Sequence, residues 1–154
     1  MRGLLVDSSY LIALFDESDP FHSPARQIFA DYFQQKINSL LLLWPILFET
    51  FSTKMSNWPR VRQISIEWKK LDSSGQIQFV DDTPFRDNSL SDWFLESERP
   101  RRAYRKFSLV DRVIRSALAS DSLRIDALLT FDNKLANDRE LSKVCTRRSI
   151  EIVK

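Results

Sequence analysis

Short apolar runs alternate with longer amphipathic segments along most of this chain. The apolar runs are typical of strands buried inside a sheet. They predict strands over Gly3–Val6, Leu40–Trp44, Ile77–Val80 and Ile125–Phe131, with a last strand near Ser149–Val153.

The segments between these runs carry apolar residues at helical spacing. They predict helices over Ser8–Ser18, Ala25–Lys36, Ile46–Ser56, Trp58–Leu71 and Ser108–Ala119. Ser108 and Asp111 have the spacing of a capping box at the start of the last helix. The segment Asp81–Lys106 is the hardest to interpret, with helical character around Asp92–Glu96 and a basic run after it.

Strands that alternate with helices favour right-handed βαβ units and a mostly parallel sheet covered on both faces. The predicted fold class is therefore α/β. The chain has 154 residues and contains no internal repeat, low-complexity tract or linker, so we expect one domain over residues 1–154. Parallel sheets of this kind bind ligands at the carboxyl ends of their strands.

Composition excludes several classes of function. Gly3 and Gly75 are the only glycines, so a glycine-rich phosphate loop is excluded. With His22 as the one histidine and Cys145 as the one cysteine, zinc sites built from these residues are not expected. The single cysteine also suits a reducing cytoplasm. The longest apolar run, Leu40–Phe48, is too short to span a membrane.

Four carboxylates are predicted to lie at the carboxyl edge of the sheet. Asp7 follows the first strand, Glu49 lies early in the helix after the second, Asp111 opens a helix, and Asp132 follows the fourth strand. Each also has a structural explanation as a helix cap, a dipole partner or a turn residue. Asp81 and Asp82 follow a strand too and are rival candidates, whereas Asp126 starts a strand and should lie at the opposite edge.

Clustered carboxylates repel one another and need protons, basic partners or a cation. An all-oxygen cluster suits Mg²⁺ or Mn²⁺, and these metals support phosphodiester hydrolysis. The pattern therefore favours a metal-dependent site but does not select four acids from the 21 in the chain.

Four stretches in this order resemble the PIN-domain family, and within it the VapC-type toxin ribonucleases. They are LLVDSSYLIALFDESDPFHSPA at the N-terminus, LFET around Glu49, FSLVDRVIRSALA around Asp111, and LLTFD at Asp132. The resemblance covers most of the chain, and its strength comes from the order of the motifs rather than from any one of them.

The resemblance implies a three-layer α/β/α sandwich and Mg²⁺- or Mn²⁺-dependent cleavage of RNA. Asp7, Glu49 and Asp111 would be catalytic metal ligands, Asp132 would complete or support the site, and Ser8 would orient a ligand or water. Family members commonly form homodimers and are inhibited by a cognate antitoxin. The chain departs from the family pattern after Asp132, and at Arg112 and Arg115, where small apolar residues are usual.

Basic residues cluster near Asp111. Those predicted to contact the RNA backbone are Arg101, Arg102, Arg105, Lys106, Arg112 and Arg115. A solvated loop explains the first four equally well, and the last two could instead neutralise the acids. Phe48, Phe51, Met55 and Trp58 could form an apolar surface for a second subunit or an antitoxin, although core packing is the simpler use.

Two functions are compatible with these residues. The favoured one is a metal-dependent endoribonuclease, the toxin of a toxin–antitoxin pair. The alternative is a non-catalytic PIN-like module that binds nucleic acid or protein, with a degenerate acidic site. A haloacid-dehalogenase phosphatase is disfavoured because Ser9 stands where its second aspartate is required.

Overall fold

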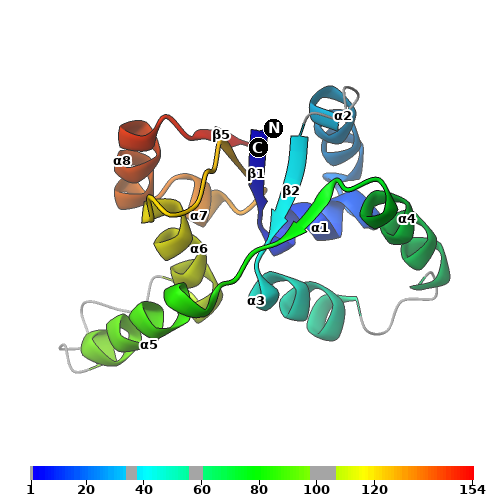
Figure 1. Ribbon diagram of the computed structural model, residues 1–154. Coiled ribbons are helices and arrows are strands. Elements are labelled where there is room, and N and C mark those ends of the chain that lie inside the picture. Colours follow the sequence, from blue (N-terminus) through cyan, green and yellow to red (C-terminus); the bar gives the residue numbers. More distant parts are fainter. Residues whose placement is uncertain (1, 34–37, 56–60, 98–106) are drawn as a thin grey trace.

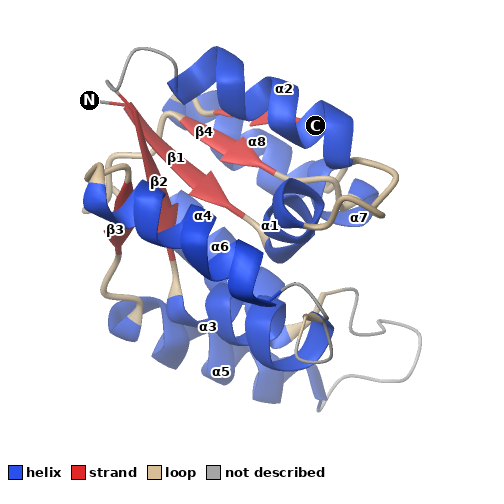
Figure 2. Cartoon of the chain, turned by 90° about the vertical axis from the view of Figure 1, so that its right-hand side faces the viewer, coloured by secondary structure: helices blue, strands red, loops and turns tan. Residues whose placement is uncertain are grey.

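The first strand of the chain is the central strand of the sheet. The computed structural model describes residues 2–33, 38–55, 61–97 and 107–154. These residues form one sheet of five parallel strands in the order β3-β2-β1-β4-β5. The strands are β1 Arg2–Val6, β2 Asn38–Leu42, β3 Ile77–Phe79, β4 Ala127–Leu129 and β5 Glu151–Val153. Figure 2 shows β1 and β4 pointing the same way.

Helices cover both faces of this sheet (Figure 1). One face carries α1 Ser8–Phe15, α2 His22–Phe33 and α4 Val61–Ser73, and the other carries α6 Leu109–Ala119 and α8 Arg139–Arg148. Below the strand ends in Figure 1, α3 Trp44–Leu47 continues into the π-helix η1 Phe48–Lys54. Helix α5 Thr83–Ser97 packs on α6. The short helix α7 Asn133–Ala136 precedes α8. The arrangement confirms the predicted α/β class and agrees with a three-layer α/β/α sandwich.

Strands β1 and β4 lie at the centre of the buried core. Leu4, Leu5 and Val6 of β1 and all three residues of β4 are fully buried. Continuous burial is expected for parallel strands, because helices cover both of their faces. A Cβ atom at Gly3 would lie 2.5 Å from the carbonyl oxygen of Arg124, so β1 can approach the β4 segment this closely only with glycine there.

Helix α6 begins and packs as its sequence predicts. The Ser108 hydroxyl accepts a hydrogen bond from the Asp111 N–H, and the Asp111 carboxylate accepts one from the Ser108 N–H, which completes the capping box. Val113, Ile114 and Leu118 are buried on the face turned to the core. This helix therefore fixes Asp111 in its first turn, close to the carboxyl edge of the sheet.

Several elements differ from the sequence prediction in extent. Helix α2 begins at His22 rather than Ala25, and α5 occupies much more of the segment 81–106 than the stretch 92–96. Helix α8 has no counterpart in the prediction, because only Leu141 and Cys145 are buried in a strongly charged segment. No helix in the described parts of the chain has the length and apolar character needed to cross a membrane.

Candidate functional site

The strand order reverses between β1 and β4. The chain builds outward from β1 to β2 and β3, and then returns to place β4 and β5 on the other side of β1. In open parallel sheets, such a reversal leaves a crevice at the carboxyl ends of the two strands, where ligands bind. Asp7 follows β1 and Thr130 follows β4, so both lie at this crevice.

Asp7 occupies the N-cap position of α1 but does not use its side chain to cap the helix. Its carboxylate is 4% exposed and accepts hydrogen bonds from hydroxyl groups instead. Ser9 Oγ donates to Asp7 Oδ2 over 2.6 Å, and Thr130 Oγ1 donates to the same oxygen over 2.9 Å. The structural explanation available from the sequence, a simple N-cap, therefore does not account for this carboxylate.

Burial raises the pKa of Asp7 above its ordinary value of 3.8. The hydrogen bonds from Ser9 and Thr130 lower the pKa and oppose this effect, whereas the charge of Asp111 raises it further. Asp111 thus lies within electrostatic reach of Asp7. A cation placed between them would offset both burial and repulsion.

Glu49 lies near the Oδ1 atom of Asp7, whereas Ser9 and Thr130 bind the Oδ2 atom. It lies in the first turn of η1, directly after the short helix that follows β2. Ser8 Oγ donates a hydrogen bond of 2.7 Å to Glu49 Oε2 and lies 3.5 Å from Asp7 Oδ1. The Ser8 hydroxyl therefore lies between two carboxylates that are 42 positions apart in the chain and donates to the second of them.

Asp111 and Asp132 each help to cap a helix with their side chains. The half-buried Asp111 serves in the capping box of α6. Asp132 Oδ1 caps α7 by accepting from the N–H groups of Lys134 and Leu135, at 2.7 and 3.2 Å. Asp132 is tied to Asp7 through Thr130, whose hydroxyl accepts from the Asp132 N–H over 3.0 Å and donates to Asp7.

The rival acids are used elsewhere. Asp82 is buried and binds the Arg86 guanidinium through both of its oxygens. Asp81 accepts a hydrogen bond from the Thr83 N–H at the start of α5. Asp126 accepts from the Gly3 N–H over 2.8 Å at the beginning of β1, which confirms that it lies at the opposite edge of the sheet.

The basic residues divide between described and undescribed parts of the chain. Arg101, Arg102, Arg105 and Lys106 lie outside the described residues. The Arg112 guanidinium lies 5.6 Å from the ring centre of Trp93, and Arg115 forms an ion pair of 3.6 Å with Asp138. Both arginines line a cavity between α5, α6 and α8.

No protein-family model matches this chain, and no curated protein matches it significantly. What the site can do must therefore be argued from its geometry.

The Asp7–Glu49 pair has the donor chemistry of a Mg²⁺ or Mn²⁺ site. These ions take oxygen ligands and commonly use one or two protein carboxylates while keeping several waters. Within the described ranges, however, no three acidic, histidine or cysteine side chains are placed to hold a metal ion together. The chemistry of the pair fits the cation, and participation of Asp111 and Asp132 as ligands stays a prediction.

Sequence reasoning overlooked the hydroxyl groups that hold Asp7. Ser9 and Thr130 bind the same carboxylate oxygen, and Ser9 Oγ also accepts from the Phe131 N–H over 2.9 Å. Ser9 follows Ser8 directly in the motif DSS, and Thr130 lies two positions before Asp132 in the motif LLTFD. Their proximity to the acids was a usable signal.

Proposed function

We propose that this chain is a metal-dependent endoribonuclease. The observation that carries the proposal is the Ser8 hydroxyl that joins Asp7 and Glu49 at the reversal point of a parallel sheet. Two carboxylates side by side, one of them buried and resisting ionisation, favour a hard divalent cation.

Each residue of the site has a defined role in this proposal. Asp7 and Glu49 would hold Mg²⁺ or Mn²⁺, while Ser8 fixes the orientation of Glu49. Ser9 and Thr130 keep Asp7 Oδ2 in place and leave Oδ1 turned toward Ser8. Asp111 adds negative charge, and Asp132 supports the site through Thr130. A bound divalent cation would supply positive charge against the phosphate and activate water for hydrolysis.

The proposal includes the biological setting implied by the family resemblance, a cytoplasmic toxin that forms a homodimer and is inhibited by an antitoxin. An apolar cavity of about 430 Å³ between η1 and α4 supports a protein partner. Trp44, Phe48 and Phe79 line it and are more than half exposed, whereas Met55 packs in the core. Trp58 lies outside the described residues.

The test is cleavage of a fluorescently labelled single-stranded RNA with Mn²⁺ or with EDTA. Asp7→Asn and Glu49→Gln should each lower the rate by at least about 100-fold, because each weakens metal binding. Asp111→Asn keeps the acceptor in the capping box, so a similar loss would identify Asp111 as a ligand rather than only a cap. Mn²⁺ titration calorimetry on the same variants should show the loss of binding directly.

Asp126→Asn is the matched control, since it makes the same chemical change at the opposite edge of the sheet and retains an acceptor for Gly3. It should cleave RNA like the wild type. Full activity in EDTA, or wild-type activity of Asp7→Asn, would refute the proposal.

One observation favours a second function, a non-catalytic module that binds nucleic acid or protein. Asp111 and Asp132 both serve as helix caps, and the described part of the chain holds no complete trio of metal-binding side chains. RNA binding without cleavage, together with no heat of binding at millimolar Mn²⁺, would identify the module.

A further inference from the structure

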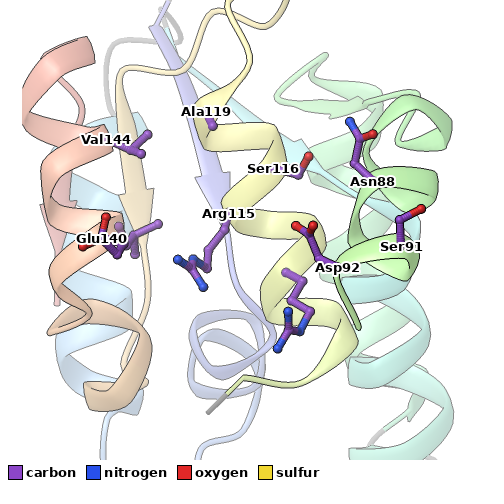
Figure 3. A pocket seen from close by; sticks show the side chains of 10 residues that line it. Asn88, Ser91, Asp92, Arg115, Ser116, Ala119, Glu140 and Val144 are labelled. Carbon is purple, nitrogen blue, oxygen red and sulfur yellow. The ribbon is translucent and has the colours of Figure 1, made fainter. Parts of the chain in front are cut away.

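A polar groove crosses the outer side of α6, the helix that carries Asp111. Its cavity measures about 620 Å³, within the range of about 300–1,000 Å³ that is typical of ligand sites. Helix α6 forms its floor, and α5 and α8 form its two walls (Figure 3). This groove is separate from the Asp7–Glu49 pair, because none of its lining residues belongs to that pair.

Two guanidinium groups from α6 line the floor, and neighbouring aromatic rings hold both. Arg112 lies 5.6 Å from the centre of the Trp93 ring and is 7% exposed. Arg115 lies 4.9 Å from the centre of the Phe107 ring, also forms the ion pair of 3.6 Å with Asp138, and has a side chain that is 30% exposed. A guanidinium fixed in this way loses little conformational freedom when it binds a phosphate, and its planar fork matches two phosphate oxygens.

The walls of the groove carry hydrogen-bond acceptors instead. Asp92 projects from α5 toward α6, and Glu140 lies on α8 across from Arg115 (Figure 3). Asn88 of α5 and Ser116 of α6 add neutral polar groups to the lining. A simple anion would be repelled by these two carboxylates. A ribonucleotide has a phosphate that could bind the two arginines of the floor. Its 2′-hydroxyl and base amino groups could donate hydrogen bonds to the carboxylates of the walls.

The groove shares helix α6 with Asp111 of the candidate catalytic edge. Asp111 and Arg112 are consecutive residues in the first turns of α6, and Arg115 follows one turn later. A strand of RNA with one phosphate at Asp7 and Glu49 could therefore continue along α6. We infer that the groove between α5, α6 and α8 binds a neighbouring ribonucleotide segment of a single-stranded RNA. This inference rests on the proposed function, because it extends the substrate path of that site.

The test measures binding separately from cleavage. A short fluorescein-labelled single-stranded RNA is titrated in EDTA and followed by fluorescence anisotropy. Arg115→Gln should weaken binding by about tenfold and reduce the slope of log K against log salt by about one, because one phosphate contact is lost. Ala119→Trp should weaken binding without changing charge, since Ala119 is an exposed residue in the groove lining.

Arg124→Gln is the matched control. Arg124 is exposed, lies next to Gly3 at the opposite edge of the sheet, and is not among the residues that line the groove. The variant should bind RNA within about twofold of the wild type, because exposed charges far from the ligand are screened. Thermal melts would verify that all three variants are folded. A DNA oligonucleotide of the same sequence lacks the 2′-hydroxyl groups and should bind more weakly than RNA. Equal binding of the two would refute a contact between the ribose 2′-hydroxyl and the walls.

The outcomes separate this inference from the proposed function. If Arg115→Gln and Ala119→Trp bind RNA like the wild type while the wild type cleaves RNA, the groove inference is wrong and the nuclease proposal stands. If both variants lose binding but no protein cleaves RNA with any metal, the groove is an RNA site and the nuclease proposal fails.

Discussion

Asp7 and Asp111 stand at equivalent places in the fold but use their carboxylates differently. Both acids lie at the start of a helix near the carboxyl edge of the same sheet. Asp111 uses its carboxylate to complete the capping box of α6. The Asp7 side chain does not cap α1 and instead accepts hydrogen bonds from two hydroxyl groups.

The difference makes one of the two acids the better candidate for a functional residue. A carboxylate that caps a helix stabilises that helix, and this role is enough to explain why an acid stands there. A buried carboxylate with a raised pKa weakens the fold and is retained here among groups that orient it. Asp7 is therefore the strongest candidate for a functional residue, and Asp111 has both a structural and an electrostatic role.

The largest effect on stability is expected when Asp7 loses a hydroxyl donor. Thr130 is fully buried, and Thr130→Val would leave one hydrogen bond to the buried carboxylate unmade, together with that from the Asp132 N–H. The free energy of unfolding should fall by about 1–3 kcal/mol at neutral pH. Urea unfolding followed by circular dichroism measures this loss. A second variant, Thr130→Ser, keeps the hydroxyl and should recover most of it.

A smaller effect is expected at the other acid. Ser108→Ala removes the acceptor for the Asp111 N–H and should lower the free energy of unfolding by about 1 kcal/mol, as for other N-caps. The RNA cleavage rate should stay near that of the wild type if Asp111 acts mainly as a cap. A loss of activity as large as that of Asp7→Asn would show that the position of Asp111 matters to the chemistry, and the contrast between the two acids would disappear.

The last expected effect is the contribution of Asp7 to the pH dependence of stability. Because the folded state raises its pKa, the folded protein binds a proton more readily than the unfolded chain does. Stability contributed by this residue should fall as pH rises from near 3.8 through the folded-state pKa, and then stay level. The difference in unfolding free energy between wild type and Asp7→Asn, measured without metal, should follow this course. An opposite slope would mean that Asp7 is stabilised as an anion.

The sequence predicted the framework well because burial imposes simple patterns. Strand β1 and helix α6 each show their buried positions as an uninterrupted run or a helical stripe. Helix α8 escaped prediction because its packing depends on few apolar residues. The π-helical form of η1 also has no signal in the pattern, although it determines where Glu49 lies.

The site was predicted only as a set of residues near one edge. The sequence could place Asp7 and Asp111 there, but not show which one caps its helix, because that choice depends on side-chain conformation. It could not show that Ser8 joins Asp7 to Glu49, or that Ser9 and Thr130 hold Asp7. These contacts form between α1, η1 and the end of β4, and only the folded chain brings these elements together.

The pairing of β1 with β4 also has a consequence for synthesis of the protein. The Thr130 hydroxyl that holds Asp7 is 123 positions farther along the chain, and β4 joins the sheet only after β3 and the segments behind it have been made. A ribosome-bound nascent chain can pair β1 with β2 early, because these strands are close in sequence. The hydrogen bond between Thr130 and Asp7 cannot form until Thr130, in the C-terminal quarter of the chain, has emerged, so the surroundings of Asp7 are completed only late in synthesis.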